Sequence, residues 1–307
     1  MSKRALAVLP LALALGLTAC GGDSGSSSRA SSSGSSAGSS ASVPTGSGPV
    51  NVLYAGSLVN LMEKQVGPAF DKASGYTFTG FGAGSTALAT QIKGKARAGD
   101  VFISASPAVN DSLTGGQNGG WVSWYATFAT SPLVIGYNPK STFAADIKSK
   151  PWYEVLSEPG ILVGTTDPVA DPKGKLANTA LTTAATQQNA PALAALAKDQ
   201  STVFPEETLV SRLQAGQLDV GFFYTAEARA AGIQTVPIPD QDLRATYTVT
   251  VLDRAANEKG AESFVQYLLG AQGVATLEED GFELTAPPAV TGSGVPDSLS
   301  KTVLSGR

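Results

Sequence analysis

The chain has 307 residues, with 21 basic and 25 acidic side chains and a formal net charge of −4 at pH 7. This acidic balance disfavours a nucleic-acid partner, which requires a basic surface. The sequence contains no histidine, and this absence excludes Ser-His-Asp catalysis, histidine-ligated zinc sites and histidine-based pH switches.

The N-terminus has the layout of a secretory signal. Lys3 and Arg4 give a basic start, and residues 5–17 form an apolar run that is too short to span a bilayer, which needs about 20 apolar residues. The Leu-Thr-Ala-Cys sequence at residues 17–20 holds the only cysteine of the chain and resembles the bacterial lipobox. We therefore predict a lipoprotein signal peptide at residues 1–19 and lipid attachment to Cys20. An ordinary signal with an incidental thiol is the alternative.

Residues 20–49 are dominated by serine and glycine. Such a composition cannot bury enough apolar surface to offset the entropy lost on ordering, so we predict a flexible linker. A coil of this length reaches roughly 30 Å. The protein is expected to be exported and held by its lipid at the outer face of the cytoplasmic membrane, on the cell surface or in the periplasm.

The first part of the remaining chain predicts a βαβαβ unit. A strand is expected at residues 52–54, followed by a helix with Ser57 as its N-cap and apolar residues at three- and four-residue spacing. Further strands are expected at residues 78–81 and 100–104, with a helix that starts at Ser85–Thr86 between them.

A second set of strands is expected at residues 132–137, 161–165 and 220–224, with a helix at residues 206–215. The strand pattern resumes at residues 246–252, and a helix at residues 261–277 follows. This alternation predicts the α/β class, with mostly parallel sheets flanked by helices.

Four segments place polar residues where a strand gives way to a helix. They span residues 55–58, 82–86, 167–174 and 204–207. Helix N-termini carry unpaired N–H groups, so several of them around one cleft would attract a dissolved anion. Ser57, Ser85, Asp171 and Glu206 are each also explained as helix caps or first-turn acids. The glycines beside both serines favour close approach of the backbone to a ligand.

In order along the chain, these segments resemble the substrate-binding proteins of molybdate and tungstate ABC importers. The likeness is carried by residues 52–58, 82–85, 100–105, 167–174 and 213–224, and it extends from residue 50 to roughly residue 290. The resemblance implies a hinged, two-lobed periplasmic-binding-protein fold of type II. The first lobe would comprise residues 50–130 and 237–307, and the second lobe residues 131–236.

By position, the resemblance implies five oxyanion-binding residues, which are Ser57, Ser85, Asp171, Glu206 and Tyr224. Asp171 and Glu206 match the acidic positions of the archaeal tungstate and molybdate branch, where they would be ligands to the Mo or W centre of the bound anion. Glu207 is the alternative register for Glu206. Two inward carboxylates would select against sulfate, because a sulfate dianion would be repelled by several kcal/mol at an effective dielectric of about 20.

The function implied by the resemblance is that of a monomeric receptor that delivers molybdate or tungstate to an ABC permease, with no cofactor and no covalent chemistry. Its lobes are expected to close by bending near residues 130 and 237. Two alternatives stay open, another oxyanion such as sulfate or phosphonate on the same fold, and an exported serine hydrolase. The hydrolase lacks support in the sequence, since no Gly-x-Ser-x-Gly motif frames Ser57 or Ser85.

Overall fold

The computed structural model describes residues 43–239 and 241–304. The predicted signal peptide, Cys20 and most of the predicted linker at residues 20–49 lie outside this described part. Within the two described ranges, no helix combines the length and the apolar character needed to cross a membrane.

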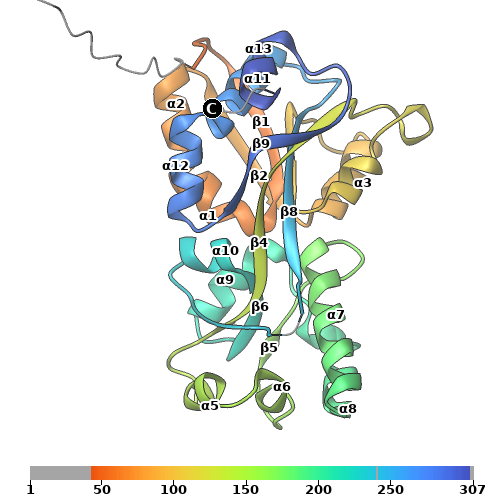
Figure 1. Cartoon of the computed structure of the whole chain (residues 1–307), viewed down its shortest axis with the longest axis vertical. Helices are drawn as coiled ribbons and strands as arrows, with labels where there is room; N and C mark the ends of the chain where they lie inside the picture. Colours follow the sequence, from red (N-terminus) through yellow and green to blue (C-terminus); the bar gives the residue numbers. More distant parts are fainter. Residues whose placement is uncertain (1–42, 240, 305–307) are drawn as a thin grey trace, which may run out of the picture. The chain divides into compact units, whose positions relative to one another are not determined.

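The strands form one hydrogen-bonded series in the order β2-β1-β3-β8-β4-β6-β5, and β7 and β9 both pair with β4 (Figure 1). Their bounds are β1 (Pro49–Ala55), β2 (Thr77–Ala83), β3 (Val101–Ser104), β4 (Trp124–Tyr137), β5 (Val163–Gly164), β6 (Val220–Tyr224), β7 (Gln234–Pro237), β8 (Arg244–Val251) and β9 (Glu283–Gly292). The strands expected from the sequence are all present, although β5 is shorter than predicted.

Strand β4 belongs to both halves of this series. Its residues 124–132 pair with β8 and β9, whereas its residues 133–137 pair with β6 and β7. We call the elements around β1, β2, β3, β8, β9 and the first half of β4 the first lobe. The elements around β5, β6, β7 and the second half of β4 are the second lobe. Figure 1 shows β4 and β8 running between the two groups.

The helices divide between the lobes in the same way. The first lobe carries η1 (Gly56–Leu58), α1 (Val59–Leu61), η2 (Met62–Val66), α2 (Gly67–Ser74), α3 (Ser85–Lys93), α4 (Pro107–Asp111), η3 (Gly116–Asn118), α11 (Glu258–Leu269), α12 (Ala271–Glu279) and α13 (Asp297–Leu304). The second lobe carries α5 (Ala144–Ser149), α6 (Trp152–Val155), α7 (Pro172–Gln187), α8 (Pro191–Leu196), η4 (Gln200–Thr202), α9 (Glu206–Gln214) and α10 (Thr225–Ala230).

The α/β class predicted from the sequence is confirmed, but the sheets are mixed rather than mostly parallel. Strand β1 pairs in parallel with β2 and β3, and β5 pairs in parallel with β6. The pairing of β3 with β8 and every pairing of β4 are antiparallel. The physical reason is the path of the chain, since strands that cross from one lobe to the other return against their neighbours.

The single helix predicted at residues 261–277 is also wrong, because the structure contains two helices there. Gly270 ends α11 in an extended conformation, with φ −81° and ψ 177°, and the same residue is the N-cap of α12. A β-carbon on Gly270 would lie 2.6 Å from the carbonyl oxygen of Gln266. The break therefore depends on glycine at this position.

Apolar side chains of each lobe pack between its sheet and its helices. In the first lobe, the rings of Phe70 and Phe264 meet edge to face with their centroids 5.1 Å apart. In the second lobe, Trp152 and Phe222 make a similar contact at 6.4 Å. These cores fix the strand ends and helix starts from which the candidate site is built.

Candidate functional site

The turns that follow β1 and β2 in the first lobe face the starts of α9 and α7 in the second lobe. A β-carbon on Gly56 would lie 2.8 Å from Glu206 Oε2, and one on Gly84 would lie 2.7 Å from the carbonyl oxygen of Ala170. The N–H of Ala87 donates a hydrogen bond to the same carbonyl at 3.0 Å. The lobes are therefore in direct contact at two places, and glycine makes room for this contact at both turns.

Ser57 lies inside the short turn η1 and is 5% exposed. The structure assigns the N-cap position of this turn to Ala55, and the Ser57 side chain makes no capping hydrogen bond. Its Oγ instead lies 3.1 Å from Oη of Tyr247, which is part of the crossing strand β8. The prediction that Ser57 is an N-cap is therefore wrong, because its hydroxyl is bound to a side chain rather than to a helix N–H.

Ser85 is fully buried and is the first residue of α3, after Gly84 at the N-cap. Its Oγ accepts a hydrogen bond from the backbone N–H of Ala105 at 3.1 Å. A hydroxyl that accepts one hydrogen bond can still donate another, so the proton of Ser85 remains able to bind an anion. A capping role explains neither Ser57 nor Ser85.

Asp171 is the N-cap of α7, as the sequence indicates, and Pro172 occupies the first helical position. Oδ1 of Asp171 accepts a hydrogen bond from the N–H of Lys173 at 3.0 Å. The second oxygen, Oδ2, is buried and has no hydrogen-bond partner. Capping thus accounts for only one of the two carboxyl oxygens.

Glu206 is the first residue of α9 and is 3% exposed, whereas Glu207 is exposed to solvent. Neither carboxyl oxygen of Glu206 has a hydrogen-bond partner. The ammonium of Lys173 lies 3.4 Å from Oε1, which makes an ionic contact. Of the two candidate acids, Glu206 therefore points toward the lobe boundary and Glu207 points to solvent.

Tyr224 ends strand β6, and its hydroxyl is buried without a partner. Its ring meets that of Tyr247 edge to face, with centroids 6.1 Å apart. Among the described residues, seven buried polar side-chain atoms lack a partner, and five of them belong to Thr166, Asp171, Glu206 and Tyr224. Such atoms are costly when buried, so their concentration here indicates a site for a polar ligand.

Two charged residues of the site were not predicted from the sequence. Lys173 is fully buried, and its ammonium donates to Oε1 and Oε2 of Glu227 at 2.8 and 2.9 Å. Glu227 also accepts a hydrogen bond from the N–H of Tyr224 at 3.2 Å. Glu227 is 3% exposed and so belongs to the buried part of the site rather than to a solvated helix face. The available signal was its position three residues after a strand end, where an acid can satisfy helix N–H groups.

The pKa values in the site reflect burial first and neighbouring charges second. Burial raises the pKa of Glu206 well above its ordinary value, and the charge of Asp171 adds to the rise while Lys173 opposes it. Burial also raises the pKa of Asp171, again against Lys173. For Lys173, burial lowers the pKa, but Glu227, Glu206 and Asp171 outweigh it and the pKa is raised. The ammonium therefore stays charged.

A cleft of ≈ 530 Å³ between the lobes reaches Asp171 from solvent. Its walls include Thr86 and Ser106 of the first lobe, Pro168 of the second lobe, and Arg244 of the crossing strand β8. Ser57, Ser85, Glu206 and Tyr224 do not line it and are all buried. The structure thus has its lobes closed over these residues, and a ligand can reach them only when the lobes separate.

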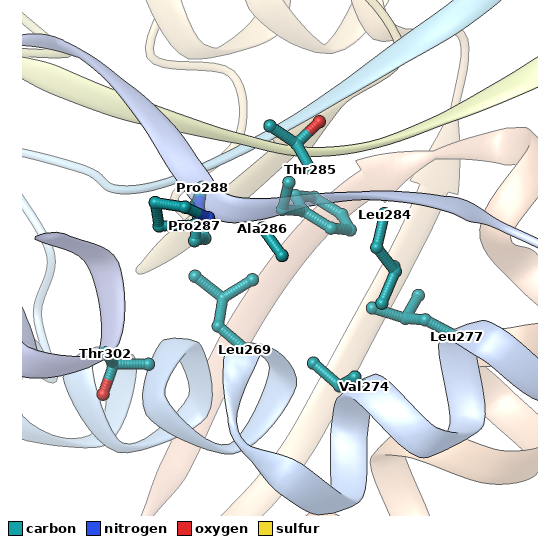
Figure 2. A pocket seen from close by; sticks show the side chains of 10 residues that line it. Leu269, Val274, Leu277, Leu284, Thr285, Ala286, Pro287, Pro288 and Thr302 are labelled. Carbon is teal, nitrogen blue, oxygen red and sulfur yellow. The ribbon is translucent and has the colours of Figure 1, made fainter. Parts of the chain in front are cut away.

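A second cavity, of ≈ 340 Å³, lies in the first lobe between β9 and the helices α11 to α13 (Figure 2). Its walls are mainly apolar, with Leu269, Val274, Leu277 and Leu284 among them, and they contain no charged side chain. This cavity has no cationic group for an anion and shares no lining residue with the polar site.

Residues 50–283 match the family described as bacterial extracellular solute-binding protein. A putative ABC transporter molybdenum-binding protein of Haloferax volcanii is 31% identical, over 58% of this chain and 56% of that protein. A molybdate/tungstate-binding protein of Thermococcus kodakarensis is 26% identical, over 60% of this chain and 66% of that protein. The periplasmic molybdate-binding protein of Azotobacter vinelandii has the same fold, with a TM-score of 0.61 at 20% identity over 77% of this chain and 99% of that chain.

Proposed function

We propose that this chain, which belongs to the bacterial extracellular solute-binding protein family, captures molybdate or tungstate between its two lobes. Family membership makes it a solute-binding protein of ABC transport and not an enzyme. The choice of ligand rests on one observation, which is that Asp171 and Glu206 bury three carboxyl oxygens without hydrogen-bond partners at the lobe boundary.

Two inward carboxylates suit a metal oxyanion better than sulfate. At an effective dielectric of about 20, a carboxylate and another unit negative charge about 4 Å apart repel each other by about 4 kcal/mol. The sulfur of sulfate offers no compensating bond. A molybdenum or tungsten centre can accept additional oxygen ligands, so lone pairs of Asp171 and Glu206 can bind the metal atom itself.

The hydroxyl groups of the site supply donors for the oxo groups of the same anion. Ser57 and Ser85 come from the first lobe, and Tyr224 comes from the second lobe. The start of α3, where Ser85 lies, also carries free N–H groups and the positive end of the helix dipole. We assign Ser57, Ser85 and Tyr224 to this donor role.

The names of two relatives support this ligand class. The Haloferax volcanii protein is named as molybdenum-binding, and the Thermococcus kodakarensis protein as molybdate/tungstate-binding. Both align over more than half of this chain.

One observation favours a second candidate, which is a different oxyanion on the same fold. The raised pKa of Glu206, caused mainly by burial, favours a neutral carboxyl group in the closed site. A neutral carboxyl group can donate a hydrogen bond, and in that form Glu206 and Asp171 could hold sulfate or a phosphonate. This alternative predicts no preference for metal oxyanions.

We further propose that ligand binding stabilises the closed form by bending the crossing segments near residues 130 and 237. The first lobe would then comprise residues 50–130 and 237–307, and the second lobe residues 131–236. Serines from one lobe and acids from the other can contact one anion only when the lobes are closed. The ligand would therefore favour closure through its higher affinity for that form.

The setting of the receptor is also part of the proposal. Lipid on Cys20 and the linker at residues 20–49 would tether it outside the cytoplasmic membrane, near the ABC permease that receives the anion. Capture would then take place close to the point of delivery, which raises the effective concentration of the receptor at the permease.

Calorimetric titration with tungstate, molybdate, sulfate and a phosphonate tests the proposed function directly. We expect tight binding of at least one metal oxyanion and at least a hundredfold weaker binding of sulfate. Tight sulfate or phosphonate binding would support the second candidate instead. No heat from either metal oxyanion would refute the proposal.

A further inference from the structure

Lys173 connects three helices of the second lobe through one buried ammonium group. The residue belongs to the first turn of α7, and its Nζ contacts Glu227 of α10 at 2.8 and 2.9 Å and Glu206 of α9 at 3.4 Å. The side chains of all three residues are at most 2% exposed. This cluster includes Glu206, one of the two acids of the proposed oxyanion site, and Lys173 lies two residues after the other acid, Asp171.

The two oxygens of Glu206 face opposite sides of the site. Oε1 faces the ammonium of Lys173, and Oε2 lies nearest to Gly56 of the first lobe, at 2.8 Å from the point where a β-carbon would stand. The carboxyl group therefore bridges from the cation of the second lobe to the turn that carries Ser57. Its orientation presents one oxygen across the lobe boundary.

Both carboxyl oxygens of Glu206 lack hydrogen-bond partners in the described structure. The ionic contact with Lys173 is therefore what holds the carboxyl group in this orientation. Lys173 is itself held firmly, since Glu227 binds it through both oxygens and also accepts from the N–H of Tyr224. The chain of contacts thus runs from the end of β6 through Glu227 and Lys173 to Glu206.

We propose that Lys173, fixed by Glu227, is a positioning residue that presents Glu206 to the metal centre of the bound oxyanion and so determines its coordination number. This inference rests on the proposed function. In the bound state, a lone pair of the presented oxygen forms one additional bond to molybdenum or tungsten, and no metal–oxygen bond of the anion breaks. Selection against sulfate follows, because sulfur accepts no such bond.

Lys173 is well suited to this role for an electrostatic reason. Glu227 cancels the charge of the ammonium, so the Lys173–Glu227 pair adds no net charge to a site that must accept a dianion. The ammonium still orients the carboxyl group of Glu206 through the contact at 3.4 Å. A purely structural ion pair would be replaceable by apolar side chains without loss of ligand selectivity, since such replacements are often neutral for stability.

The test compares the full-length protein with a double variant, Lys173→Met/Glu227→Met, which removes both charges of the Lys173–Glu227 pair together and leaves Glu206 in place without its cation. The control is Lys150→Met/Glu158→Met, which removes a partly exposed ion pair of the same lobe. The measurements are thermal unfolding, the affinities for molybdate and sulfate, and the X-ray absorption spectrum of bound molybdate. The spectrum reports the number of oxygen neighbours of molybdenum.

We expect the double variant to fold, to lose at least tenfold in molybdate affinity relative to sulfate, and to hold molybdate with fewer oxygen neighbours than the wild type. The control should match the wild type in all three measurements. If the methionine pair does not fold, Lys173→Gln/Glu227→Gln gives the same test, because its two amides can hydrogen-bond to each other.

Two outcomes would overturn the inference while leaving oxyanion capture intact. The first is a folded double variant whose ratio of molybdate to sulfate affinity and whose X-ray absorption spectrum match those of the wild type. The second is a wild-type complex in which molybdenum has only four oxygen neighbours. A wild-type protein that binds neither molybdate nor tungstate would refute the proposed function, and this inference with it.

Discussion

Gly56 packs against the side chain of Glu206 across the boundary between the two lobes. A β-carbon at position 56 would lie 2.8 Å from Oε2 of Glu206 and 2.9 Å from its Cβ, and such distances are too short for real atoms. Even the smallest side chain on Gly56 would therefore push the lobes apart at the site. This relationship makes glycine a requirement for closure rather than for folding.

The variant Gly56→Ala should accordingly weaken tungstate binding at least tenfold, measured by calorimetry. The free energy of unfolding of the ligand-free protein should fall by less than the free energy of binding, because the lobes can separate at this contact without unfolding. Gly116→Ala is the matched control, since nothing lies within 4 Å of its added β-carbon. Unchanged affinity in Gly56→Ala would mean that the ligand is not held in this closed arrangement.

Removing either inward carboxylate should reduce metal-oxyanion affinity strongly. We expect Asp171→Asn and Glu206→Gln each to lose at least tenfold for tungstate, while sulfate binding stays constant or improves as repulsion is relieved. Asparagine keeps the N-cap of α7, so Asp171→Asn separates capping from ligand binding. Glu207→Gln, at the exposed neighbouring position, should behave as the wild type. Equal tungstate affinities in all three variants would show that the acids are only structural.

The hydroxyl of Tyr247 should contribute to affinity through Ser57. The two side-chain oxygens lie 3.1 Å apart, so Tyr247→Phe removes the partner that orients the serine. The loss of a hydrogen bond worth about 1 kcal/mol corresponds to a roughly fivefold larger dissociation constant for tungstate. Tyr267→Phe, a buried tyrosine elsewhere in the first lobe, is the control. A loss of stability without a loss of affinity would count against this role of Tyr247.

The stability of the ligand-free protein should depend on pH through Glu206. Burial, followed by the charge of Asp171, raises the folded-state pKa of Glu206 well above its ordinary value. Between the ordinary and the raised value the folded protein binds more protons than the unfolded chain, so stability falls as pH increases through this window.

Glu206→Gln removes this titration, and Glu227 remains to balance Lys173. Chemical denaturation should therefore show that the free energy of unfolding of the variant rises relative to that of the wild type as pH increases above the ordinary pKa of a glutamate. A difference in the free energy of unfolding that does not change with pH would indicate that Glu206 is not buried in the ligand-free protein.

The predicted tether can be tested at Cys20. Cys20→Ser should abolish lipid attachment, so the protein should move from the membrane fraction to the soluble fraction, as measured by fractionation and mass spectrometry. Ser24→Ala, in the same serine-rich segment, should leave the distribution unchanged. An unmodified Cys20 in the wild-type protein would favour the ordinary signal over the lipoprotein signal.

Local patterns in the sequence predicted much of the fold. Apolar runs located seven of the nine described strands and missed β7 and β9. The Asp171–Pro172 pair located the start of α7, because this signal acts over a few residues. The mixed pairing of the sheets was not predicted, since it depends on where β4 and β8 cross between the lobes. The break at Gly270 was missed because the apolar periodicity continues on both sides of it.

The candidate site was predicted in part. The five residues derived from the resemblance all lie at or next to the lobe boundary, although their role in ligand binding remains a proposal. The Ser57–Tyr247 contact joins residues 190 positions apart, and the Lys173–Glu227 pair joins residues 54 positions apart. No local pattern encodes such partners, because only the closed fold brings them together. The same limit explains why the buried Glu206 could not be told from Glu207.

Strand β4 has a consequence for how the molecule loses its structure. Its 14 residues lie inside the sheet series between β8 and β6, with one part bonded to strands of each lobe. If one lobe unfolded alone, its part of β4 would lose its strand partners while the rest of β4 stayed paired in the other lobe. Denaturation should therefore proceed as one cooperative event, so a single melting temperature would report on the integrity of both lobes.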